Sequence, residues 1–178
     1  MNVLYIKILP TMEPNIQQTC KEMLQQRGYT IQKDDDDIII GKKNASEIVV
    51  FYNSCAKFNV ERVQEYISLM KNISINHAIV VYIDSVTPVA KKVIEELQDI
   101  TIELFEVKML RYNITKHRLV PKHTALTKAE SMKFRNTYGT LIPVILTTDP
   151  ICRFYFFKRG DIIRIDRPDG YVSFRIVK

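Results

Sequence analysis

The chain of 178 residues carries a formal net charge of +6 and has 46% hydrophobic and 26% charged residues, with only five glycines and seven prolines. This composition is typical of a folded globular protein and excludes a disordered or fibrous chain. The apolar runs are far shorter than the ~20 residues that span a bilayer, and the N-terminus lacks the apolar core of a secretory signal. We therefore expect an intracellular protein with no membrane partner.

The first 110 residues alternate between predicted helices and strands. Pro14 suits a first helical turn and Gly28 suits a helix end, so a helix is predicted between them. Short β-branched runs at 38–40 and 48–52 predict a hairpin whose turn is formed by the polar residues 41–44. The chain is thus expected to open with a helix and an antiparallel pair of strands.

The following segments predict strands separated by helices. Helical spacing predicts a helix at 60–70, and the continuous apolar run at 78–83 predicts a strand that is covered on both faces. A further helix is predicted from Pro88, and the alternation at 100–104 predicts another strand. The inward face of that helix is expected to comprise Val89, Val93, Ile94 and Leu97. Together these elements predict an α/β domain, a mixed sheet with flanking helices.

The last third of the chain differs in charge. Residues 1–110 have 12 Lys and Arg against 15 Asp and Glu, a net of −3, whereas residues 111–178 have 14 against five, a net of +9. Such a basic block suits nucleic-acid phosphates or an acidic protein surface, and the sequence leaves both open. Pattern and charge alone place a boundary that gives two domains, 1–112 and 113–178.

The second domain is predicted to be a small α+β domain. A capping box at 127–130 predicts a short helix that ends near Gly139. Asp149 and Pro150 suit the start of another short helix, which carries aromatic residues. The turn sequence at 168–170 predicts a terminal antiparallel hairpin.

Few carboxylates are placed to bind a catalytic metal. The run from Asp34 to Asp37 is the one acidic cluster, and consecutive residues of an extended segment point to opposite faces, so a solvated turn is the favoured interpretation. Asp84 with Glu106 and Lys108 is loosely similar to the set with which some endonucleases hold a metal. A nuclease therefore stays open as an alternative, as does a free-standing transcription regulator.

Histidines and cysteines show no metal-site or disulfide spacing. We expect hydrogen-bonded histidines and buried cysteines, at His77, His117, His123, Cys20, Cys55 and Cys152. Phosphate-cradling glycine loops and nucleophile motifs do not occur in the sequence. We therefore expect no catalytic residue, no metal and no cofactor.

Several segments resemble one known family. Residues 113–123, NITKHRLVPKH, are similar to the N-I-T-x-H-x-L-V-P-K-H stretch of the fifth subunit of cellular and viral DNA-directed RNA polymerases, of which archaea possess the C-terminal domain alone. Residues 148–150, 157–165 and 170–177 keep the order of further motifs of that family's C-terminal domain. The sequence KEML with RGY in the first helix and the TPVA stretch at 87–90 resemble the N-terminal part of the eukaryotic subunit.

The resemblance implies a non-catalytic subunit of a multisubunit RNA polymerase that supports transcription. It implies a restriction-endonuclease-like N-terminal jaw domain near downstream duplex DNA, and a C-terminal assembly domain that docks on the largest subunit. The implied partners are that subunit, the rest of the polymerase and DNA, and the chain is not expected to be a homo-oligomer. A viral chain would work in host cytoplasm and be packaged in the virion, whereas a cellular one would be nuclear.

The resemblance also carries over to residues. The expected DNA-proximal residues are Thr87, Pro88, Lys91 and Lys92, which suit a sequence-independent phosphate contact. The expected assembly interface comprises Leu119, Val120, Pro121, Lys122, His123, Asp149, Pro150, Lys158, Arg159 and Gly160. The simpler alternatives are that Pro88 only starts a helix and that 119–121 belongs to the core of its own domain.

This sequence departs from the family pattern in three places. The loop at 165–171 is several residues shorter, the region at 41–47 is abbreviated, and Val89 replaces the serine of the Thr-Pro motif. We therefore expect contacts made by those loops in the family to be missing from this chain. The shortened jaw and the abundance of Ile, Lys, Asn and Asp are typical of an AT-rich genome, such as that of a large DNA virus.

Overall fold

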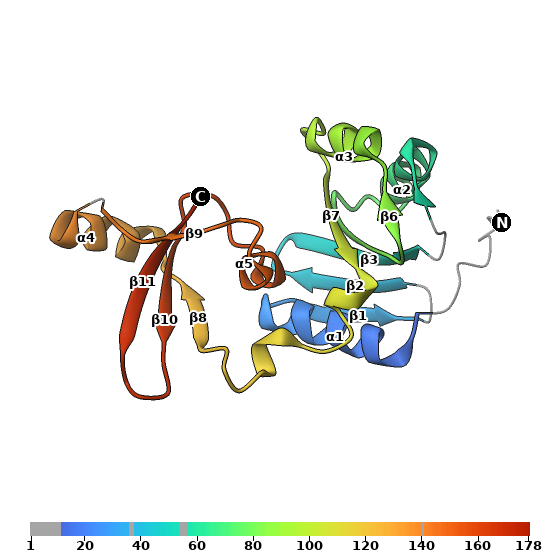
Figure 1. Ribbon diagram of the computed structural model, residues 1–178. Coiled ribbons are helices and arrows are strands. Elements are labelled where there is room, and N and C mark those ends of the chain that lie inside the picture. The colour runs from blue at the N-terminus through green and yellow to red at the C-terminus, as the bar shows by residue number, and fades with distance from the viewer. Residues whose placement is uncertain (1–11, 36–37, 54–56, 140) are drawn as a thin grey trace. The chain divides into compact units, whose positions relative to one another are not determined.

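A computed structural model describes residues 12–35, 38–53, 57–139 and 141–178. The chain divides into two compact units, Met1–Tyr112 and Asn113–Lys178, and each is described by itself (Figure 1). Among the described residues, no helix has the length and apolar character that a membrane crossing requires.

The first unit contains a five-stranded mixed sheet. Its elements in chain order are α1 (Pro14–Gln26), β1 (Thr30–Asp34), β2 (Ile38–Lys43), β3 (Ser46–Asn53), β4 (Lys57–Phe58), α2 (Val60–Asn72), β5 (His77–Tyr82), β6 (Ser85–Val86), α3 (Pro88–Glu95), β7 (Thr101–Glu106) and the 3-10 turn η1 (Val107–Met109). The strand order is β1-β2-β3-β5-β7. β1, β2 and β3 are antiparallel neighbours, whereas β3, β5 and β7 run parallel, because α2 and α3 return the chain between them.

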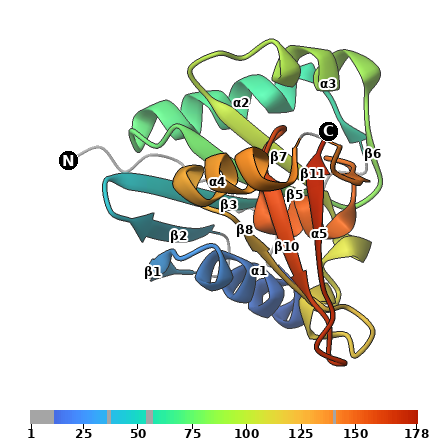
Figure 2. The same ribbon diagram turned by 90° about the vertical axis from the view of Figure 1, so that its left-hand side faces the viewer.

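Helices cover both faces of this sheet. Figures 1 and 2 place α1 on one side of the sheet and α2 with α3 on the other. On the α1 side, the Leu24 side chain packs over Gly41, where an added Cβ would lie 3.3 Å from the Leu24 Cδ1 atom. On the other side, the Tyr66 ring of α2 lies 5.0 Å from the Phe51 ring of β3, centroid to centroid. The first unit is therefore a three-layer sandwich, with buried side chains between the sheet and the helices on each of its faces.

Most local predictions for the first unit are confirmed. α1 starts with Pro14 in its first turn and is followed by Gly28, whose φ of +86° suits glycine. The hairpin, α2 and the two-sided strand β5 also form where they are expected. The polar turn is placed differently, because Gly41 to Lys43 belong to β2 and the chain reverses at Asn44, with φ of 52°.

The orientation predicted for α3 is wrong at its first turn. Val89 is 62% exposed, whereas its neighbour Ala90 is buried. The position of Pro88 at the helix start sets this register, so that Val93, Ile94 and Leu97 pack against the core as expected but Val89 faces out.

The second unit is a four-stranded sheet with one helix on each face. Its elements are η2 (Ile114–Lys116), β8 (Lys122–Ala125), α4 (Lys128–Tyr138), β9 (Val144–Ile145), α5 (Pro150–Tyr155), β10 (Ile162–Asp166) and β11 (Val172–Val177), with strand order β8-β10-β11-β9. On the α5 face, Cys152 packs with Ile163, Ile165, Val177 and Ile145. On the other face, the α4 residue Phe134 lies 4.4 Å from the Phe174 ring of β11, centroid to centroid.

The cap and hairpin predictions for the second unit are confirmed. The Thr127 hydroxyl accepts from the Glu130 N–H, and the Glu130 carboxylate accepts from the Thr127 N–H, which closes the capping box of α4. Asp149 caps α5 by accepting from the Ile151 N–H at 2.8 Å. β10 and β11 form the expected antiparallel hairpin.

Candidate nucleic-acid and docking surfaces

The four expected DNA-proximal residues lie together at the start of α3. The Thr87 hydroxyl accepts from the Ala90 N–H at 3.2 Å and caps the helix, and the Thr87 N–H donates to the Phe58 carbonyl at 3.0 Å. Pro88 occupies the first turn and is exposed. The prediction that Pro88 starts a helix is confirmed.

Lys91 and Lys92 lie one helical turn after Thr87 and Pro88. Both side chains are exposed, and the Lys92 ammonium lies 3.9 Å from the Glu96 carboxylate. An exposed pair of this kind is worth little in free energy, so both ammonium groups are available to a phosphate. The N-terminal end of a helix adds partial positive charge beside them.

The residues of the nuclease alternative lie at or just after the carboxyl ends of β5 and β7. Tyr82 and Glu106 are register partners at the ends of β5 and β7, and Asp84 follows β5. The Glu106 carboxylate pairs with Lys108, and its hydrogen bond raises the pKa of that lysine. Among the residues that the structure describes, no three His, Cys, Asp or Glu side chains gather as metal ligands do.

The acidic run after β1 is also engaged within its own unit. The Asp34 carboxylate lies 2.9 Å from the Lys21 ammonium, and Asp35 lies 2.7 Å from Lys33. Asp36 and Asp37 lie outside the described residues. Asp34 ends β1 and Asp35 follows it, and both side chains are exposed, so the described part of the run is solvated but begins in a strand.

A buried charged network joins α1 to the sheet. The Arg27 guanidinium donates two bonds to the Glu103 carboxylate, at 2.7 and 2.9 Å, and the His77 Nε2 atom lies 2.8 Å from the same carboxylate. Burial acts to raise the pKa of Glu103, but the hydrogen bond to His77 and the charge of Arg27 outweigh it and hold that pKa below its ordinary value. The network fixes the end of α1 on β5 and β7, and His77 is the hydrogen-bonded histidine that was expected.

The cysteines of the described chain are buried, as expected. Burial raises the pKa of the Cys20 thiol to about 12 and that of the Cys152 thiol to about 11. Thiols with such pKa values are inert nucleophiles. Cys55 lies outside the described residues.

The expected assembly residues 119–123 run into the edge strand β8. Leu119 is 74% exposed and lies outside the domain core, whereas Val120 and Pro121 are half-buried. The His123 Nδ1 atom lies 2.8 Å from the Pro121 carbonyl oxygen, and burial lowers the pKa of that imidazole. Lys122 begins β8 and is exposed. This segment therefore presents an apolar side chain and an ammonium group at a sheet edge.

The other expected assembly residues have local structural roles as well. Asp149 and Pro150 start α5. The Lys158 ammonium lies 3.1 Å from the centroid of the Phe156 ring. Gly160 donates to the Val177 carbonyl and accepts from the Arg135 guanidinium, each at 2.9 Å, and it follows Arg159 in an exposed turn.

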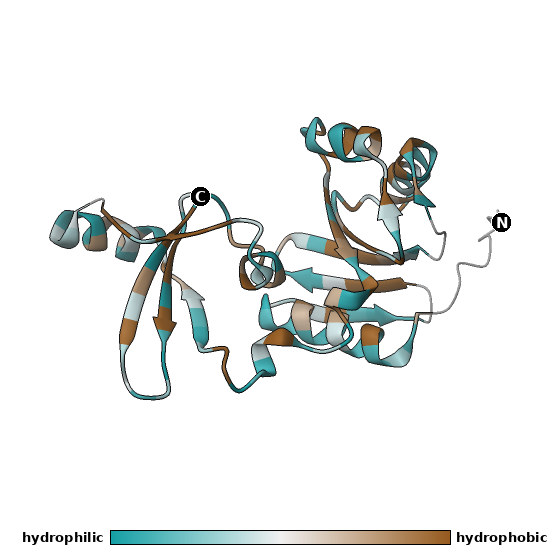
Figure 3. Cartoon of the chain, viewed as in Figure 1, coloured by the Kyte–Doolittle hydropathy of each residue, from teal (hydrophilic) through white to brown (hydrophobic). Residues whose placement is uncertain are grey.

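Sequence reasoning missed a further apolar surface of the second unit. Residues 141–146 read LIPVIL, which is typical of a core strand, yet only Ile145 is buried. Leu141 is 99% exposed and Leu146 is 58% exposed. Figure 3 colours this stretch between α4 and β9 as hydrophobic. An apolar run without a place in the core is the signal that could have indicated a docking surface.

Known proteins resemble the chain over both units. A family model described as "RNA polymerase Rpb5, C-terminal domain" matches residues 112–177, and one described as "Restriction endonuclease" matches residues 11–113. The second match confirms the fold class expected for the first unit. The Dictyostelium discoideum protein named "DNA-directed RNA polymerases I, II, and III subunit rpabc1" is 34% identical over 158 residues, which cover 83% of this chain and 76% of that protein.

Relatives from a virus and a plant are similarly close. "Putative DNA-directed RNA polymerase subunit 454R" of Invertebrate iridescent virus 6 is 35% identical over 180 residues, which cover 90% of this chain and 97% of that protein. "DNA-directed RNA polymerase subunit 5-like protein 1" of Arabidopsis thaliana is 32% identical over 185 residues, which cover 87% of this chain and 88% of that protein. The similarity therefore extends along nearly the whole length of cellular and viral proteins alike.

Proposed function

The chain belongs to the Rpb5 family of DNA-directed RNA polymerase subunits, and from this premise we propose that it is a non-catalytic subunit with two separate tasks. The first unit contributes to the jaw near downstream duplex DNA, and the second docks on the largest subunit during assembly. The observation that carries the proposal is the similarity of the chain, along nearly its whole length, to polymerase subunits.

The ion pairs formed by the carboxylates of the nuclease alternative and of the acidic run support a non-catalytic role. Glu106 is held by Lys108, and Asp34 is held by Lys21, so these carboxylates already have cationic partners within the fold. A two-metal centre needs several carboxylates that converge on one point. The nuclease alternative would have to recruit Asp84 and Glu106 against these pairings.

The α3 surface supports a role close to DNA. Thr87 and Pro88 form a capped loop, and the exposed Lys91 and Lys92 lie beside the positive end of the helix. Ammonium groups on a rigid loop suit phosphates at any base sequence. We propose that this surface contacts the phosphate backbone only when the polymerase holds the duplex beside it.

The sheet edge of the second unit supports a role in assembly. Leu119 offers an exposed apolar anchor, and Lys122 offers a charge at the edge strand β8. Asp149 at the start of α5 and the exposed turn at 158–160 extend the proposed interface. We propose the largest polymerase subunit as the partner and expect no homo-oligomer.

The proposed subcellular location of the chain is that of the polymerase to which it belongs. A virus-encoded chain would act in host cytoplasm and enter the virion, and a chain of a cell would act in the nucleus. The similarity to an iridescent-virus subunit supports the first option, and the similarity to cellular subunits supports the second.

Affinity purification of the full, tagged chain from the cells that make it tests the proposal. We expect the two large polymerase subunits in amounts equal to the chain at moderate salt, and the chain alone should bind DNA weakly. Recovery of the chain without polymerase, together with magnesium-dependent cleavage that Glu106→Ala abolishes, would instead establish a nuclease. Tight binding of one preferred DNA sequence by the free chain would establish a regulator.

A further inference from the structure

The second unit has a sheet face that its own helix does not seal. Side chains alternate along β11, so Val172, Phe174 and Ile176 share the face that α4 contacts. Val144 of β9 is the register partner of Ile176 and lies on the same face, with Leu146 two residues further on. We call these five residues the α4–β9 face.

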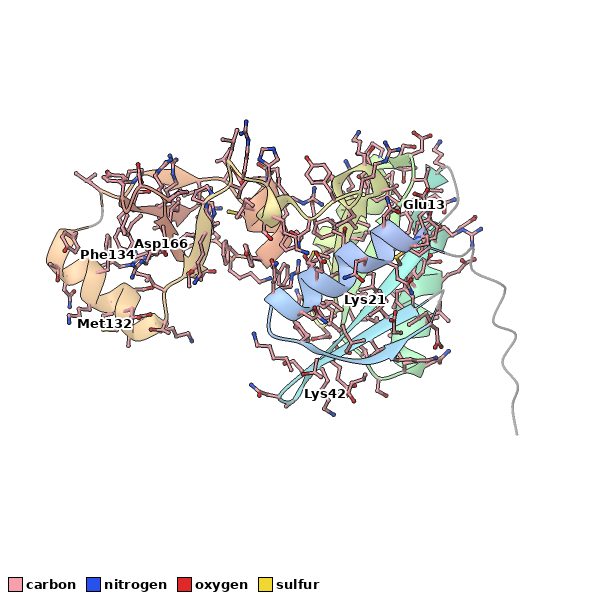
Figure 4. All side chains as sticks on the ribbon, turned by 90° about the horizontal axis from the view of Figure 1, so that it is seen from below. Glu13, Lys21, Lys42, Met132, Phe134 and Asp166 are labelled. Carbon is pink, nitrogen blue, oxygen red and sulfur yellow. The ribbon has the colours of Figure 1, made fainter. Side chains whose placement is uncertain are left out.

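α4 covers this face only in part. None of its residues is buried. Its Phe134 ring lies 4.4 Å from the Phe174 ring of β11 and 4.8 Å from the Tyr138 ring of the same helix, centroid to centroid. Figure 4 shows Phe134 toward the strands and Met132 on the opposite flank of the helix. Tyr138 is 70% exposed, and Val144 and Val172 are exposed as well. A contiguous exposed apolar surface of this kind marks an interaction site.

The charge around the face is positive. α4 and the face side of β10 and β11 carry two acids against four cations, Lys128, Lys133, Arg135 and Arg164, and Lys178 follows β11. Both acids have partners: Asp166 accepts from Arg164 at 2.8 Å, and Glu130 closes the capping box. Residues 113–178 as a whole have 13 Lys and Arg against five Asp and Glu, a net of +8.

From this combination we propose that the α4–β9 face binds an acidic amphipathic segment of another polymerase subunit at the β9 edge of the sheet, whereas Lys122 lies at the opposite edge, on β8. The inference rests on the proposed function and adds a second docking surface to it. Apolar side chains of the segment would pack on Leu146 and Val144, and its carboxylates would meet the surrounding cations.

Other occupants fit these observations less well. A second copy of the chain would bring a unit of net charge +8 against another of +8, and like charges at an interface are costly. Duplex DNA offers phosphates to the lysines, but it makes no use of exposed Leu141, Val144 and Leu146. A protein segment that is both acidic and apolar uses the whole surface.

Photo-crosslinking in a reassembled polymerase tests the inference. The full chain carries a benzophenone amino acid in place of Leu146 or, as the matched position for the proposed function, in place of Leu119. It is added to polymerase reassembled from its separately expressed subunits with this chain omitted. We expect Leu146 to cross-link to a stretch of another subunit rich in Asp or Glu and apolar residues, identified by mass spectrometry.

The outcomes separate this inference from the proposed function. Cross-links from Leu119 to the largest subunit without any from Leu146 would overturn the second surface and leave the proposed function standing. Cross-links from Leu146 to DNA, to a second copy or to the first unit of the same chain would also overturn it. A chain that is not retained by the polymerase at all would overturn both.

Matched substitutions test the charge of the partner. Leu146→Glu and Leu146→Lys remove the same apolar contact and introduce opposite charges at an exposed position. Against an acidic segment, we expect Glu to weaken binding to the reassembled polymerase about tenfold or more, and Lys to weaken it clearly less. Leu69→Glu in α2, an exposed leucine of the first unit, is the control and should leave binding unchanged. Equal losses from Glu and Lys would overturn an acidic partner.

Discussion

In the two units of the chain, helices cover the faces of the sheet to different degrees. In the first unit, helices cover both faces of the sheet, and the strands β3 and β5 are almost entirely buried. In the second unit, α5 covers one face, whereas α4 contributes no buried residue to the other. The difference teaches that the first unit is built to hold its own shape, and that the second leaves apolar surface for a partner to cover.

The largest expected effect comes from the buried charge of the first unit. Replacing Glu103 by Ala leaves the Arg27 guanidinium buried without its carboxylate, which should cost about 3–5 kcal/mol of unfolding free energy. Chemical denaturation followed by circular dichroism measures the change. Glu106→Ala, at the end of the same strand, where Glu106 is half-buried and its partner Lys108 is exposed, is the control and should change stability clearly less, by about 1 kcal/mol or below. Equal effects of the two would show that the network does not hold the first unit together.

Substitution of one buried leucine and one exposed leucine tests the difference between the two units most directly. Leu24 of α1 is fully buried and Leu141 is 99% exposed. Leu24→Ala should cost about 2–5 kcal/mol because it leaves a cavity, whereas Leu141→Ala should leave stability within ~0.5 kcal/mol. If Leu141→Ala lowered the unfolding free energy of the free chain by a similar amount, Leu141 would be covered within the second unit. The two units would then not differ in how well they cover their apolar side chains.

A smaller effect of opposite sign is expected after α5. Phe156 has a φ of 58°, in the left-handed region that favours glycine. Phe156→Gly should therefore stabilise the second unit by up to about 1 kcal/mol, as measured by thermal unfolding. Phe157→Gly is the control, because Phe157 packs against the core and its loss should be destabilising. A destabilised Phe156→Gly would show that the Phe156 ring contributes more by its contacts than the backbone strain costs.

The last expected effect is absent at neutral pH and appears only in acid, where the first unit should lose unfolding free energy. The pKa of Glu103 lies below the ordinary value of 4.5. Its contribution to stability is therefore complete above about pH 4.5 and is lost as the pH falls through the lowered pKa of the folded state. Unfolding at a series of pH values should show a weaker acid loss in Glu103→Gln than in the parent chain. Identical pH profiles would contradict the assignment.

Local features of the fold could be predicted from the sequence. Pro14, Gly28 and the capping box at 127–130 act within one or two helical turns, so their residue types were sufficient. The strand β1 was missed because its sequence TIQKD is polar and almost fully exposed at the sheet edge. β9 was missed because two residues form it, and only their register with Ile176 and Val177 makes them a strand.

The surfaces were harder to predict than the fold. Thr87, Pro88, Lys91 and Lys92 were placed by resemblance, and they do share one exposed helix start. Arg27 and Glu103 are 76 residues apart, so no local pattern could join them. The run LIPVIL drew no prediction, and hydrophobicity alone does not tell whether the surface that covers such a run belongs to the same chain.

The position of β11 has a consequence for synthesis on the ribosome. β11 lies between β10 and β9 and is made after both of them, and Val177 and Lys178 bond back to Gly160, Ile145 and Thr147. Until β11 has left the exit tunnel, β9 has no neighbour and the α4–β9 face does not exist. A truncated product that stops before Val172 would lack this face, so partner binding there would discriminate finished chains from incomplete ones.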